Sequence, residues 1–171
     1  AWTEGTSSTS VYLASLAAPG RRIELRSDVP GLVPSFFSED GNYLAAVHGN
    51  LLTTGADSLR AWNVETGQIV ASIGERIEDA TFAAGGRVLV ASIKQGNDHE
   101  IGFYDLANPD RPSRRVPGRH VSMTLAVSPD GGLVAASSAG GQVWLFDPAK
   151  GELLESVHGQ LNSTFGIAFS P

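Results

Sequence analysis

The stretch VSPDGGLVAASSAGGQVWLFDPAKG, Val127 to Gly151, decides how the rest of the chain is interpreted. A Ser-Pro-Asp-Gly turn signal at positions 128–131 leads into a run of small apolar residues. A second glycine-rich turn follows, and then Gln142–Asp147, whose alternation is typical of a strand. The order predicts antiparallel β-structure, and a recurrence of it elsewhere would define a repeating unit.

The same pattern recurs along the chain. A turn follows an apolar residue at positions 37, 82, 127 and 169, so the copies are spaced by 45, 45 and 42 residues. A second anchor is an alternating strand that ends on an aromatic slot and then a polar slot. The aromatic slot holds Ala14 (the weakest copy), Trp62, Tyr104 and Phe146, and the polar slot holds Ser15, Asn63, Asp105 and Asp147. Two independent anchors with similar spacing indicate a structural repeat, and we expect the aromatic slot to pack between units.

A period of about 40–45 residues with several short strands is typical of a β-propeller blade. At these anchors the chain resembles the WD-repeat family, through the turn at 128–131 and the aromatic-Asp pairs Tyr104-Asp105 and Phe146-Asp147. The resemblance covers nearly the whole chain. It implies an all-β fold, a β-propeller of four-stranded antiparallel blades, here divergent and of bacterial type. No Gly-His dipeptide precedes a first strand, so we do not expect the buried His–Asp hydrogen-bond network of that family.

We therefore expect a single propeller domain over residues 1–171, with blade remnants near 1–26, 27–71, 72–116, 117–158 and 159–171. These make about four blade equivalents, and the last segment is available to complete the first blade. Propellers have roughly 4–8 blades, so two interpretations stay open. The chain is either part of a larger ring, completed by missing blades or a second chain, or a small self-closing ring. We favour the larger ring.

Composition limits the function classes. The net charge of −6 lacks the basic stripe that nucleic-acid binding needs. No apolar run approaches the roughly 18 residues that span a bilayer, so we expect no membrane partner. The absence of cysteine excludes disulfides and thiolate chemistry. It leaves the compartment open, with the cytoplasm slightly favoured, and nothing in the sequence predicts a cofactor.

The candidate interaction surface is the face onto which two kinds of loop open. With strands a to d counted outward from the axis, these are the b–c turns and the d–a connections. They differ in length between units, and variable loops on a rigid scaffold commonly carry binding residues. All four histidines map to this face. The residues that we assign to the surface are His48, Asn50, Leu51, Lys94, Asn97, Asp98, His99, Arg119, His120 and His158.

The histidines do not predict a metal or catalytic site, because no pair has tight ligand spacing such as H-x-x-x-H. We expect a non-catalytic scaffold or sensor module that binds a protein or peptide through the loop face, as the resemblance also implies. The alternative is a propeller hydrolase, similar to lactonases or glycosidases, with a site at the axial channel. Strand a offers only Glu78 and Asp79 as ionisable residues there. A third possibility is an oligomerisation segment that must pair with a second chain to close its ring.

Overall fold

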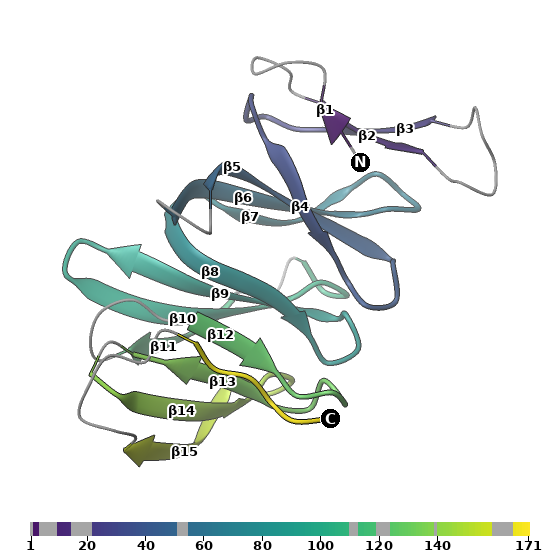
Figure 1. The fold of residues 1–171 in the computed structure, drawn as a ribbon. Helices are drawn as coiled ribbons and strands as arrows, with labels where there is room; N and C mark the ends of the chain where they lie inside the picture. Colours follow the sequence, from purple (N-terminus) through teal and green to yellow (C-terminus); the bar gives the residue numbers. More distant parts are fainter. Residues whose placement is uncertain are drawn as a thin grey trace.

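The computed structural model describes residues 2–3, 10–14, 22–50, 55–109, 113–118, 124–138, 140–158 and 166–171. These residues form fifteen strands and no helix (Figure 1). All the strand pairs are antiparallel, so the prediction of an all-β fold is confirmed. The described strands do not form a closed ring of sheets, and the propeller stays a prediction.

The strands fall into three sheets. The first sheet contains β1 (Trp2–Thr3), β2 (Ser10–Ala14) and β3 (Arg22–Arg26). The second contains β4 (Val33–Phe37), β5 (Tyr43–Asn50), β6 (Gly55–Asn63), β7 (Ile69–Ile73), β8 (Arg76–Ala83), β9 (Val88–Gln95), β10 (Asp98–Asp105) and β11 (Arg114–Gly118). The third contains β12 (Thr124–Val127), β13 (Val134–Ser137), β14 (Gln142–Asp147) and β15 (Glu152–His158).

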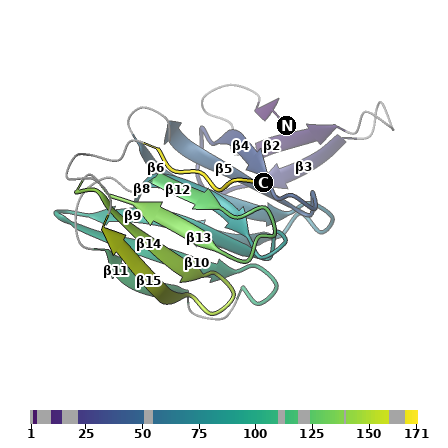
Figure 2. The same ribbon diagram turned by 60° about the horizontal axis from the view of Figure 1, so that its bottom comes forward.

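The eight-stranded sheet is two four-stranded units joined at one point. Strands β4 to β7 pair in sequence order, as do β8 to β11, and among the described residues the one strand pairing between the two units joins Ala56 of β6 to Ile77 of β8. Together with β12–β15 the chain therefore has three successive four-stranded meanders. Figures 1 and 2 show them stacked in chain order, with the C-terminal segment 166–171 alongside β12.

Each junction between neighbouring units holds an apolar cluster. The first cluster, between the first sheet and β4–β7, joins Val11, Leu13 and Leu25 to Leu44, Ala46 and Trp62. The second, between β4–β7 and β8–β11, joins Ala45, Leu59 and Ile73 to Ile77, Leu89 and Ile93. The third, between β8–β11 and β12–β15, joins Val88, Val90, Ile101 and Phe103 to Leu125, Val134 and Phe146. The aromatic slot takes part at each junction, since Trp62 is fully buried, Tyr104 packs on the second cluster, and Phe146 meets Phe103 with ring centroids 5.5 Å apart. These side chains face the preceding unit.

The turn anchor has a local chemical cause. Ser128 Oγ donates to Asp130 Oδ1 (2.5 Å) and accepts the backbone N–H of Leu133 (2.9 Å). Ser38 makes the same two bonds with Asp40 (2.6 Å) and Tyr43 (2.9 Å). A hydroxyl and a carboxylate at this spacing therefore close the turn between the first and second strands.

The residues of the polar slot also act through local hydrogen bonds. Asn63 Oδ1 accepts the backbone N–H groups of Glu65 and Thr66, and Asp147 Oδ1 accepts that of Lys150. Asp105 Oδ1 likewise accepts the N–H of Ala107. A short side-chain acceptor at the end of the third strand thus satisfies the donors of the turn that follows.

Two side chains of β6 tie the second sheet to the first sheet and to the connection that follows β3. Trp62 Nε1 donates to the carbonyl oxygen of Arg26 (2.9 Å). The buried guanidinium of Arg60 forms two hydrogen bonds with the Asp28 carboxylate (2.8 and 3.0 Å) and also donates to the carbonyl oxygens of Leu59 and Ile73. The guanidinium lowers the pKa of the exposed Asp28 carboxyl.

Replacing Ser128 with alanine should lower the free energy of unfolding by about 1–3 kcal/mol, because the N–H of Leu133 loses its buried acceptor. Urea denaturation measures the change. Ser156→Ala, at an exposed position of β15, is the matched control and should shift stability by less than about 0.5 kcal/mol. Equal effects of the two variants would contradict the role of the turn hydroxyl.

Asp28→Ala should lower the melting temperature more than Arg60→Met does. The first variant leaves a buried guanidinium without its carboxylate, whereas the second removes the charge and keeps an apolar chain. Calorimetry of both proteins at neutral pH tests the order. A larger loss for Arg60→Met would mean that the carbonyl contacts of Arg60, rather than its pairing with Asp28, hold the junction.

Candidate functional site

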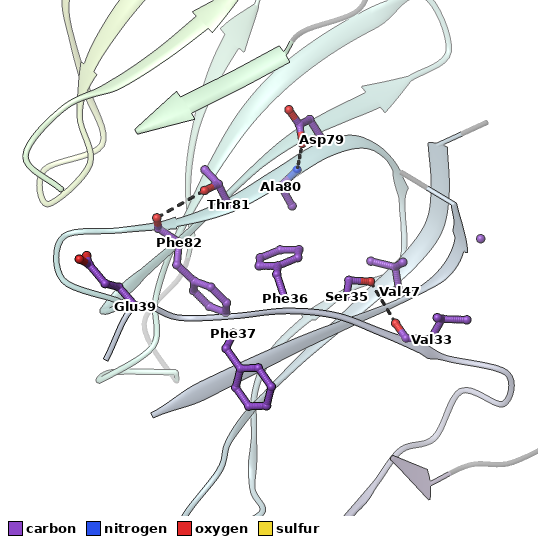
Figure 3. Close-up of a pocket in the computed structure, with 11 residues that line it drawn as sticks. Val33, Ser35, Phe36, Phe37, Glu39, Val47, Asp79, Ala80, Thr81 and Phe82 are labelled. Carbon is purple, nitrogen blue, oxygen red and sulfur yellow. Dashed lines mark hydrogen bonds between the residues drawn. The ribbon is translucent and has the colours of Figure 1, made fainter. Parts of the chain in front are cut away.

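A groove with a volume of about 780 Å³ lies between β4 and β8 (Figure 3). Its lining comprises Val33, Ser35, Phe36, Phe37, Glu39, Val47, Gly49, Asp79, Ala80, Thr81 and Phe82. The rings of Phe36 and Phe82 point toward each other between the two strands, edge to face, with centroids 5.2 Å apart. The centre of the groove is therefore an aromatic surface built by two different units.

The position and sequence of β4 explain why this groove is accessible to solvent. β4 is the last strand at its edge of the sheet, with β5 as its described neighbour. Its pairing with β5 shifts between Pro34 and Phe36, and a bulge of this kind redirects side chains at a sheet edge. Val33 is 54% exposed and Phe37 48%, high values for large apolar side chains. Phe36 points into the groove, while Phe37 points to the other side of β4 (Figure 3).

Asp79 is one of two carboxylates in the lining, and it has a structural task. Its Oδ1 accepts the backbone N–H of Ala80 and its Oδ2 accepts that of Leu125 in β12, each at 2.8 Å. The side chain thus ties β8 to the first strand of the next unit. Burial raises the pKa of this carboxyl, partly offset by the two N–H donors.

Glu78, beside Asp79, forms a pair that the sequence analysis did not anticipate. The pairing of β8 with β9 shifts between Ile77 and Asp79, so Glu78 lies at an irregular position. Its Oε2 lies 3.2 Å from Nδ1 of His99, whose side chain is buried. Lys94 Nζ lies 4.0 Å from the other carboxylate oxygen. One unit therefore places a buried histidine against a carboxylate, with residues other than those of the WD-repeat pattern and without a hydrogen bond between Glu78 Oε2 and His99 Nδ1.

The residues assigned to the loop surface have different positions in the structure. His48 lies exposed in β5, His158 lies exposed in β15, and Asn97 and Asp98 are exposed where β9 turns into β10. Lys94 is half-buried near the end of β9. The side chain of Asn50, and Leu51, Arg119 and His120 entirely, lie outside the described residues.

The placement of His99 on that surface needs correction. It lies in β10 rather than in a turn and is only 2% exposed, with its Nδ1 3.2 Å from the Glu78 carboxylate. Sequence reasoning also missed the groove residues. Phe82 was seen only as a repeat anchor, and the Phe36–Phe37 doublet on a first strand was the available signal.

Within the described part of the chain, no three His, Cys, Asp or Glu side chains gather in a way that could hold a metal ion. The same part contains no helix long and apolar enough to cross a membrane. Neither a scan against protein-family models nor a search of the curated proteins finds a match to the chain.

The free energy of unfolding of the wild type, relative to that of Asp79→Asn, should fall as pH rises above about 4. The pKa of Asp79 is raised by folding, so the unfolded chain ionises this group first, near pH 3.9. Stability that the neutral carboxyl contributes is then lost as pH rises through the folded pKa, whereas asparagine does not ionise. Urea titrations of both proteins from pH 3 to 7 measure the difference. A difference that stays constant with pH would contradict the shift.

Proposed function

We propose that the chain is a non-catalytic binding module of β-propeller type, which holds an extended segment of a protein or peptide in the groove between β4 and β8. The observation that carries the proposal is the aromatic floor of this groove, formed by the half-buried rings of Phe36 and Phe82 beside the exposed side chains of Val33 and Phe37. Exposed apolar surface that is concave and rimmed by polar groups is the common form of a binding site in proteins.

The propeller arrangement is supported by contacts between successive first strands. Asp79 of β8 bonds to the backbone of β12, and the N–H of Ala84 donates to the carbonyl oxygen of Gly131 (2.9 Å), which joins two equivalent turns. The described part of the first sheet has three strands and lacks a counterpart of β4. The segment Phe169-Ser170-Pro171 repeats the sequence type of Val127-Ser128-Pro129, so it has the character of the missing first strand.

The groove and the loop face proposed from the sequence meet at one end. Val47 and Gly49, at the end of β5, belong to the groove lining and flank His48. His48 itself is exposed beside this end of the groove and is not part of its lining. Contacts with the more variable loops would add specificity to an affinity that comes from the aromatic floor.

The alternative of a propeller hydrolase has less support. Such a site needs carboxylates that are free to exchange protons with a substrate. Both oxygens of Asp79 accept backbone N–H groups, and Glu78 lies against His99 and Lys94. Both carboxylates of β8 thus make contacts within the protein, which favours the binding module.

Filling the groove should weaken peptide binding. Peptides selected from a displayed library of eight-residue sequences should bind the wild type, and Ser35→Trp should weaken them at least about tenfold, equivalent to about 1.4 kcal/mol. Ser35 is exposed and lines the groove, so tryptophan there occupies the space of the ligand without disturbing the buried core.

The matched control is Ser156→Trp, which adds the same side chain at an exposed position of β15. Fluorescence anisotropy with each selected peptide compares the three proteins, and circular dichroism verifies that they fold alike. Peptides that bind the wild type and Ser35→Trp with the same affinity, or a library that yields no binder, would refute the proposed function.

A further inference from the structure

The charges of the groove define what kind of segment it takes. The described lining contains two carboxylates, Glu39 and Asp79, and no lysine or arginine. Asp79 is committed to two backbone N–H donors, as described above. Glu39 is exposed, and no hydrogen bond or ion pair engages its carboxylate within the described part of the chain. The groove therefore has one uncommitted charge, and that charge is negative.

The position of Glu39 gives the groove a direction. Figure 3 shows Glu39 at the end where Phe82 lies, and Val33, Ser35 and Val47 at the other end. A lysine or arginine beside Glu39 would lay its aliphatic stem on the Phe82 ring and keep its charged head in water. An aromatic face next to a cation adds a further attraction of about 0.5–1 kcal/mol at exposed sites.

The backbone of β4 decides how the segment is held. Five residues in extended form span about 17 Å, so the groove accommodates about five residues of an extended chain. Pro34 has no N–H to donate, and the bulge beside it breaks the regular ladder at this edge. The hydroxyls of Ser35 and Thr81 already donate to the carbonyl oxygens of Val33 and Phe82. Side-chain contacts, rather than a continuous ladder, must therefore supply the affinity.

We infer that the groove selects an extended peptide segment whose apolar side chains lie over Phe36 and Phe82 and whose lysine or arginine lies beside Glu39. The inference rests on the proposed function and adds the chemistry of the partner to it. The chain's own net charge of −6 favours the same partner, because a basic segment is attracted to the whole molecule before it docks.

Two fluorescein-labelled peptides test the inference. Each has eight capped residues with alternating valine and serine in the middle, and carries either a lysine or a glutamate at both ends. The wild type should bind the lysine peptide at least about fivefold more tightly than the glutamate peptide, a preference that falls in high salt. Glu39→Lys should weaken the lysine peptide about fivefold and strengthen the glutamate peptide.

Glu65→Lys makes the same charge change at an exposed turn outside the groove lining, and it should keep the wild-type preference. If Glu65→Lys changes the preference as much as Glu39→Lys does, the effect comes from net charge and the inference is wrong. If Glu39→Lys has no effect while Ser35→Trp still blocks binding, the groove binds peptides without reading their charge, and the proposed function survives alone. If Ser35→Trp leaves both peptides bound, both proposals fail.

Discussion

The packing of each four-stranded unit against the one before it is the constraint on which the rest of the structure depends. Small residues let neighbouring sheets pack closely, and the second strands supply five buried alanines among larger apolar side chains: Ala45, Ala46, Ala91, Ala135 and Ala136. The turns must also fit. A Cβ on Gly86 would lie 2.7 Å from Asp40 Oδ1 in the preceding turn, so only glycine permits this contact. The aromatic slot residues Trp62, Tyr104 and Phe146 then fill the remaining space at the three junctions.

This constraint makes the last described sheet different from those before it. Ile73 of β7 and Val157 of β15 occupy equivalent places, opposite Leu59 and Val143 in their own sheets. Ile73 is 1% exposed because β8–β10 cover it, whereas Val157 is 45% exposed. Leu153 and Leu154 are exposed on the same strand. Among the described residues, the face that an inner unit buries is thus uncovered on β12–β15, and further blades or a second chain, two options that the sequence leaves open, would make contact there.

The sequence predicts features with a local cause and misses those that depend on two units. Ser128 with Asp130, and Asn63 with its turn, act within a few residues, so their spacing alone revealed the repeat. Glu78 and His99 lie on different strands, and Asp28 lies in the connection between β3 and β4 whereas Arg60 lies in β6; nothing in the sequence near either residue identifies its partner. The sequence analysis did not predict the groove for the same reason. Loop length drew attention to the turns, whereas the groove arises because two first strands present phenylalanines to each other.

The two carboxylates of the groove show how the same functional group takes different tasks according to its surroundings. Asp79 is largely removed from water and holds backbone N–H groups of two strands, so a change there alters the junction between β8 and β12 before it alters any ligand. Glu39 is exposed to solvent at the end of the groove, and no described residue forms a hydrogen bond or ion pair with its carboxylate. A charge in water contributes modestly to affinity but strongly to the choice between partners of opposite sign. In this groove, therefore, the apolar floor would set how tightly a segment binds and Glu39 would set which segment is chosen.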